Sequence, residues 1–144
     1  MHPRRAGISA ILRSYLDLRG ADRSPLPAQR FRLAPHPAIF DDAKVKPGAK
    51  IVIFHTADVP EGYSSLDLSY IRDNNIIIAL KLNDITLPPE RGFPFQVVAE
   101  SKFGYKWAKW ITRIEISDNT SFRGFWEGYG YNNNADINGP AFEQ

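Results

Sequence analysis

Four short apolar runs, each bounded by turn-forming residues, set the strongest limit on how this chain can fold. They are rich in β-branched residues, which favour strands, and each is too short for an ordinary buried helix. The runs are KIVIFH (50–55), NIIIALKLN (75–83), FQVVAES (95–101) and WITRIEISD (110–118). Glycine and proline clusters such as VKPGAK and TLPPERGFP separate them. The pattern predicts an α+β domain, a strand-rich mixed sheet with few and short helices.

Two short helices are expected beside these strands. Residues 7–18 carry apolar side chains at helical spacing, and SLDLSYIRD can form one or two turns opened by Ser64 or Ser65 as the N-cap. Four prolines between Pro25 and Pro37 exclude a regular helix or a central strand there. We therefore expect an exposed, irregular segment in that stretch.

The composition changes near residue 38. Residues 1–32 hold seven arginines and two aspartates, and no lysine precedes Lys44. We therefore divide the chain into a divergent Arg- and Pro-rich segment at 1–38 and a domain at 39–144, whose aromatic tail is expected to wrap onto the domain surface. An arginine-rich leader with one helix is also typical of an organellar transit peptide, an alternative that stays open.

The usual catalytic sets are missing from the sequence. The chain has no cysteine, and its three histidines are not at metal-ligand spacing, so we identify no metal site and no catalytic residue. His55 ends a predicted buried strand and is interpreted as a structural histidine. No apolar run approaches the ~20 residues of a membrane span, and no signal peptide is recognisable. The cytoplasm is therefore the default location.

Lysines and tryptophans crowd together in SKFGYKWAKW, directly after the third predicted strand. Lys102, Lys106 and Lys109 surround Gly104, and a glycine beside ammonium groups suits the binding of a phosphate. If the segment is extended, Lys106 and Lys109 lie on opposite faces, and one reaches a buried phosphate while the other stays at the surface. Two other interpretations are solvated lysines above core tryptophans and a nucleic-acid surface, which the acidic balance of residues 33–144 disfavours.

Several ordered motifs resemble the second half of the molybdopterin-binding oxidoreductase domain, the domain of sulfite oxidase and of the periplasmic methionine-sulfoxide reductase catalytic subunit. The motifs are KPGAKIVIFHTAD, GYSSLDLSYI, LNDITLPPERGFP, GYKWAKW and FRGFWEGYGYNNNAD, within residues 41–136. The resemblance implies a partial sulfite-oxidase-type molybdopterin-binding fold. It also implies that the cofactor is molybdopterin, which carries the molybdenum.

The same resemblance assigns residues to the cofactor. The GYKWAKW segment helps to hold the phosphate end of molybdopterin in the family, which implies contacts from Gly104, Tyr105, Lys106 and Lys109, with Trp110 as a packing residue. The NDITLPPERGFP loop lies near the cofactor in the family, which adds three weaker candidates. These are Asn83, Arg91 and Gly92.

Two departures separate the family's activity from this chain. Many relatives have an arginine that helps to bind an anionic substrate where this chain has Gln96, and the family's molybdenum-ligating cysteine is missing. The sequence therefore predicts part of a molybdopterin-dependent oxidoreductase that transfers oxygen atoms at molybdenum, inactive as this chain alone.

The partner that would complete such a domain is expected to be an N-terminal half-domain or a second copy of the chain, and no nucleic acid is expected to bind. The alternatives are a non-catalytic ligand-binding or interaction domain and a gene remnant. Family members also occur in the periplasm. The sequence specifies neither the substrate nor the redox partner.

Overall fold

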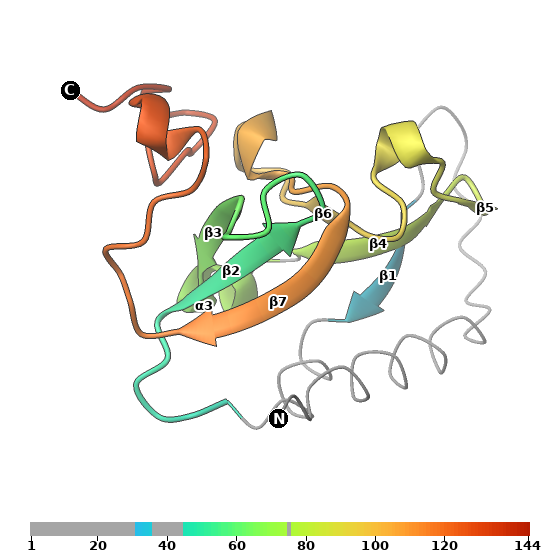
Figure 1. Ribbon diagram of the computed structural model, residues 1–144, viewed down its shortest axis with the longest axis horizontal. Helices are drawn as coiled ribbons and strands as arrows, with labels where there is room; N and C mark the ends of the chain where they lie inside the picture. Colours follow the sequence, from blue (N-terminus) through green and yellow to red (C-terminus); the bar gives the residue numbers. More distant parts are fainter. Residues whose placement is uncertain (1–30, 36–44, 75) are drawn as a thin grey trace.

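The computed structural model of the chain describes residues 31–35, 45–74 and 76–144 (Figure 1). Its strands form two small sheets, and every described pairing between them is antiparallel. One α-helix and three 3-10 turns complete the described part of the chain. The strand-rich α+β expectation is therefore confirmed, whereas the helix expected at 7–18 lies outside the described residues.

The first sheet has the strand order β3-β2-β7. Its central strand β2 (Ile51–Thr56) pairs with β3 (Ser64–Asp67) on one side and with β7 (Ile111–Ser117) on the other. All six residues of β2 are buried, as a continuous β-branched run predicts for a strand covered on both faces. Most of β7 is only partly buried, in agreement with its alternating sequence.

The second sheet is built around β4 (Ile77–Leu82), which pairs with β1 (Phe31–Pro35), with β5 (Ile85–Thr86) and with β6 (Gln96–Val98). The expectation of an irregular course is wrong for the five residues of β1. This strand pairs with β4 alone, and an edge strand tolerates proline because one row of its backbone groups needs no partner.

The helix α3 (Leu68–Asp73) begins later than the sequence suggested. Ser64 and Ser65 were expected to cap it, but both belong to β3 and pair with β2, and Asp67 precedes the helix without a side-chain capping bond. The β2–β3 pairing satisfies the backbone of the serines, so the helix starts only where that pairing ends.

The main core lies between the two sheets and α3 and includes buried side chains from five strands and the helix. Its members include Val52, Phe54, Leu66, Leu68, Ile71, Ile78, Val97 and Ile111. A smaller cluster of Ala79, Leu87 and Val98 packs on the opposite face of β4. Ile78 and Ala79 enter different clusters because successive residues of a strand point to opposite faces.

The C-terminal tail, residues 118–144, folds back against the body of the domain (red in Figure 1). The Phe125 amide donates to the Tyr63 carbonyl (2.9 Å), and the Phe103 amide donates to the Ala135 carbonyl (2.8 Å). Phe125 and Trp126 pack edge to face, with ring centroids 5.4 Å apart. These contacts confirm that the aromatic tail wraps onto the domain surface.

Candidate functional site

Three loops meet at Trp110, the residue immediately before β7. The Trp110 carbonyl accepts a hydrogen bond from the Ala57 amide (3.0 Å), and the Trp110 amide donates to the Gly92 carbonyl (3.2 Å). The indole Nε1 donates to the Pro89 carbonyl (2.6 Å). Trp110 has a φ of +53°, and such left-handed conformations of non-glycine residues cost about 1–3 kcal/mol and cluster at functional sites. Trp110, which the sequence predicted as a packing residue, therefore joins these loops. We call the surface formed by Trp110, residues 89–92 and Lys109 the Trp110 face.

At Gly92 the loop after the 3-10 turn η1 (Pro89–Arg91) packs closely against Lys109. Gly92 has a φ of +104°, a conformation that favours glycine. A Cβ atom added at Gly92 would lie 2.9 Å from the Lys109 Cβ. Only glycine therefore lets the two segments pack this closely, which places Lys109 against the residue that follows Arg91.

Arg91 and Lys109 give the Trp110 face a positive charge. Arg91 is exposed and Lys109 is half-buried, with its ammonium group donating to the Glu90 carbonyl (3.3 Å). Within the described part of the chain, neither cation forms an ion pair with a carboxylate. Two cations without a carboxylate partner among the described residues suit an anionic group such as a phosphate.

Lys106 lies in a different environment. The segment Gly104–Lys106 forms a 3-10 turn rather than the extended strand that the sequence interpretation considered, so Lys106 turns inward. Its side chain is fully buried, donates to the Ser65 carbonyl (3.0 Å) and the Asn133 Oδ1 atom (3.2 Å), and forms an ion pair with Glu127. One lysine is thus buried and the other nearer the surface, as expected, but the carboxylate of Glu127 neutralises the buried one.

Burial lowers the pKa of the Lys106 ammonium below its ordinary value, and the nearby Glu127 carboxylate opposes that shift. Removing an ammonium from water disfavours its charged form, whereas an opposite charge in contact favours it. The carboxylate, the carbonyl and the amide together replace the lost water, so Lys106 is held by partners from the protein itself.

Gly104 and Tyr105 lie with Lys106, next to the tail. Gly104 is exposed and has no atom within 4 Å of the place where a Cβ would be, so its backbone is accessible. The Tyr105 hydroxyl donates to the Asn132 carbonyl (2.6 Å), and burial raises the pKa of that hydroxyl to about 12. Six of the seven predicted cofactor residues therefore form two groups, one on the Trp110 face and the other in this turn.

The other two positions that the resemblance singled out occupy the second sheet. Asn83 lies in the turn between β4 and β5 and has a φ of +51°. Gln96 is buried in β6, 5% exposed, and lies opposite Ala79 of β4. An uncharged amide fits this buried position within the sheet better than an arginine, because a buried charge without a partner is costly.

His55 is structural, as expected. It is 4% exposed, its Nδ1 atom donates to the Pro60 carbonyl (2.8 Å), and its Nε2 atom lies 2.8 Å from a carboxylate oxygen of Glu115. Both ring nitrogens are occupied. No group of three or more metal-ligating side chains occurs among the described residues, and none of the helices found there is long and apolar enough to cross a bilayer.

Two features of the site were missed by the sequence interpretation. Glu127 was not singled out because a glutamate in an aromatic tail looks like a solvated charge until the fold brings Lys106 beside it. Lys102 was noted only as part of the lysine cluster, yet it is buried and bonded to Asn134 of the tail. No local pattern marks such pairs, whose members are more than twenty residues apart.

The sequence of the chain matches a known protein family. Residues 28–126 match the family described as the oxidoreductase molybdopterin binding domain. Since this match covers more than half of the chain, the protein belongs to that family.

The similar proteins are larger oxidoreductases. A nitrate reductase [NADPH] of Fusarium oxysporum is 37% identical over 84 residues, 55% of this chain and 9% of that protein. The mitochondrial sulfite oxidase of Drosophila melanogaster is 35% identical over 79 residues, 50% of this chain and 14% of that protein. The uncharacterized oxidoreductase YuiH of Bacillus subtilis is 33% identical over 99 residues, 68% of this chain and 48% of that protein.

A solved structure shares the fold. The sulfane dehydrogenase SoxCD of Paracoccus pantotrophus superposes with a TM-score of 0.53 at 29% identity, over 58% of this chain and 21% of that chain. The chain thus spans about a tenth of the length of the nitrate reductase, and between a seventh and a half of the other relatives named. The expected family and a partial domain of that family are therefore confirmed.

The residues on the Trp110 face fit one end of molybdopterin. Arg91 and Lys109 suit its phosphate, because charged donors without a carboxylate partner among the described residues can pair with an anion. The molybdenum end finds no thiolate here, since the chain has no cysteine. The fit is therefore to the phosphate.

Proposed function

We propose that this chain binds the phosphate end of molybdopterin through the Trp110 face, as one part of an oxidoreductase that transfers oxygen atoms. The observation that carries the proposal is the close packing of Gly92, the residue after Arg91, against Lys109, with both cations free of carboxylate partners among the described residues. The bound cofactor would supply the two-electron chemistry of molybdenum, and this chain would supply the binding and orientation of its phosphate.

Lys106 has a supporting role in this proposal. Its ammonium group is neutralised by Glu127 and lies inside the protein, so a phosphate would have to compete with a carboxylate already in contact. Lys106 and Glu127 instead hold the Gly104–Lys106 turn against the tail. The backbone at Gly104 and the Tyr105 side chain remain candidates for the outer part of the cofactor site.

The thiolate ligand of molybdenum would come from outside residues 1–144, either from another half-domain or from a partner chain. That thiolate and its surroundings orient the metal in the family, so we expect the chain alone to bind cofactor without catalysing a reaction. The compartment and the redox partner would follow from the complete protein.

The test is the pterin content of the full chain after expression in a host that makes the cofactor. We expect bound pterin in the wild type, and a reduction of about tenfold or more in Lys109→Gln and in Arg91→Gln, because a charge-assisted hydrogen bond contributes about 1.5–3 kcal/mol. Lys46→Gln is the matched control, since Lys46 is an exposed lysine in the turn before β2. Pterin in Lys109→Gln at the level of the control would contradict the assignment.

A second candidate function is a ligand-binding or interaction domain without catalysis. The buried, uncharged Gln96 and the internal neutralisation of Lys106 favour it, because both remove charge from positions that the resemblance linked to anions. Absence of pterin from the wild-type chain, together with an intact fold, would support this candidate over the first.

A further inference from the structure

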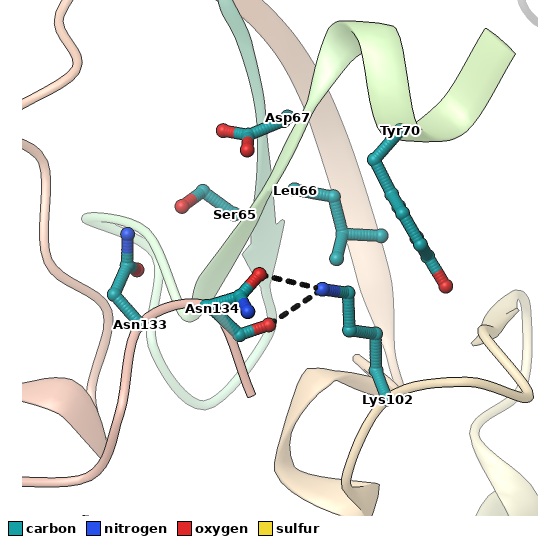
Figure 2. A pocket seen from close by; sticks show the side chains of 7 residues that line it. All are labelled: Ser65, Leu66, Asp67, Tyr70, Lys102, Asn133 and Asn134. Carbon is teal, nitrogen blue, oxygen red and sulfur yellow. Dashed lines mark hydrogen bonds between the residues drawn. The ribbon is translucent and has the colours of Figure 1, made fainter. Parts of the chain in front are cut away.

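A second candidate site lies away from the Trp110 face, between β3 and the C-terminal tail (Figure 2). It is a cavity of about 100 Å³ and shares no residue with the Trp110 face. One wall comes from β3 and α3, the opposite wall from the tail, and a buried lysine forms the floor. The lining residues are Ser65, Leu66, Asp67, Tyr70, Lys102, Asn133 and Asn134.

Lys102 gives the cavity a positive potential from within. It is 7% exposed, and its ammonium group donates to the backbone carbonyl of Asn134 (2.7 Å) and to the Asn134 Oδ1 atom (2.9 Å). The same nitrogen lies 4.4 Å from the centre of the Tyr70 ring. Its hydrogens are therefore directed at fixed partners, and its charge acts on the cavity without making Lys102 the direct ligand.

The two asparagines that line the cavity have unused amide donors. An ammonium group can only donate, so an amide that bonds to it must present its oxygen and leave its NH₂ group for other partners. Asn134 presents its oxygen to Lys102, and Asn133 presents its oxygen to Lys106 (3.2 Å). Among the described residues, neither NH₂ group has an acceptor, so two amide donors remain for a ligand.

Ser65 and Asp67 complete the lining from β3. They are two residues apart on one strand, so their side chains lie on the same face, and in Figure 2 both point to the same side of β3. Within the described part of the chain, the Asp67 carboxylate forms no ion pair and the Ser65 hydroxyl forms no hydrogen bond. The cavity therefore has hydroxyl and amide donors at one end and a carboxylate at the other.

We propose that this cavity binds a small zwitterion, an α-amino acid about the size of glycine. The ligand carboxylate accepts from the amides of Asn133 and Asn134 and from Ser65, with Lys102 supplying the positive potential behind them. The ligand ammonium lies against Asp67. The volume holds about three waters, which limits the ligand to a compact molecule with little or no side chain.

The bound ligand would bridge two parts of the chain, because Asp67 and Ser65 belong to β3 whereas the asparagines belong to the tail. A ligand that binds only while the tail is docked against β3 stabilises the docked tail by mass action. Binding at this cavity therefore couples to the docking of the tail, independently of any cofactor on the Trp110 face.

The test is a titration of the ¹⁵N-labelled full chain, followed by amide chemical shifts. The probes are glycine, acetate, methylammonium and valine, which separate the zwitterion from its two charges and from a larger side chain. We expect glycine to saturate with a dissociation constant of about 1 mM or weaker, since so small a ligand has few contacts. Its shifts should centre on residues 65–67 and 133–134, and the other three probes should bind at least several-fold more weakly.

The decisive variant is Asp67→Asn. Asp67 is exposed and makes no side-chain capping bond, so the substitution leaves the fold intact. It should weaken glycine severalfold and leave acetate unchanged, whereas Asp73→Asn at the end of α3 should behave as the wild type. The proposal is overturned by the absence of saturable glycine shifts, by acetate binding as tightly as glycine, or by Asp67→Asn binding glycine like the wild type.

Discussion

Lys106 and Glu127 form an ion pair from which water is excluded, with 0% and 1% of their side chains exposed. The pair joins the turn at Gly104–Lys106 to the aromatic tail, across twenty-one positions of sequence. Taking two charges out of water is costly, and their attraction offsets that cost only while both are present. The pair therefore makes the position of the turn depend on the tail.

Loss of one partner should destabilise the fold strongly. Lys106→Met leaves the Glu127 carboxylate buried without its counter-ion, which we expect to cost about 3–5 kcal/mol of unfolding free energy. The double variant Lys106→Met, Glu127→Leu should recover most of that loss, because two apolar side chains pack together and leave no buried charge. Urea denaturation of the full chain measures both effects. Lys46→Met is the control, and a Lys106→Met protein as stable as this control would exclude the role of the pair.

The strands were predictable from the sequence because their signal is local. The β-branched run at 50–55 indicated a buried strand, and the structure has that strand one residue later, at Ile51–Thr56. The start of α3 was missed because the serines satisfy their backbone through β2, a contact between segments that no local pattern records. The start of a helix that depends on where a strand pairing ends is therefore not specified by the local residues.

The candidate site was predictable only as a set of residue types. The sequence placed Lys106 and Lys109 on opposite faces, but it could not show which of them turns inward, because that follows from the 3-10 turn at Gly104–Lys106. It also could not show that Trp110 adopts a left-handed conformation, since that follows from the loops that meet there. Only the fold shows that Lys109 packs against Gly92, the residue after Arg91.

The hydroxyl of Tyr105 should give the stability of the protein an alkaline limit. Burial raises its pKa from the ordinary value of 10.0 to about 12, so in this range the folded chain keeps a proton that the unfolded chain loses. The contribution of this group is therefore complete below pH 10 and is lost as the pH rises toward 12.

Tyr105→Phe removes this titration, so its unfolding free energy should fall less steeply with pH in that window. Urea midpoints of both proteins at about pH 9, 10 and 11 measure the difference. The pKa of Tyr63 is also raised by burial, but Tyr63 is present in both proteins and its effect cancels. Parallel pH profiles for the two proteins would show that Tyr105 does not set the limit.

Gly124 should be required for the docking of the tail. A Cβ atom added there would meet the Tyr63 carbonyl and lie 2.7 Å from a Glu127 carboxylate oxygen, so Gly124→Ala pushes the tail away from β3. We expect faster hydrogen exchange at the amides of Phe125 and Phe103, which donate across this contact. Gly128→Ala is the matched control in the same tail, since a Cβ there meets nothing within 4 Å. Equal exchange in the two variants would refute the claim.

Gly92 allows the closest packing on the Trp110 face, and its replacement should affect both stability and binding. Gly92→Ala faces a φ of +104° and a Cβ contact of 2.9 Å with Lys109. The left-handed conformation costs an alanine about 1–2 kcal/mol, and the overpacking should add about 1–3 kcal/mol. Gly48→Ala separates the two effects, because Gly48 has a φ of +93° and open space around it.

In denaturation experiments, the unfolding free energy of Gly92→Ala should therefore be lower than that of Gly48→Ala by the cost of overpacking alone, about 1–3 kcal/mol. Pterin content measured in parallel should fall in Gly92→Ala and stay at the wild-type level in Gly48→Ala, because only the former pushes the loop at Gly92 away from Lys109. Equal losses of stability would mean that the loop moves aside without strain. Unchanged pterin in a destabilised Gly92→Ala would mean that the phosphate is held elsewhere, with the Gly104–Lys106 turn as the next place to test.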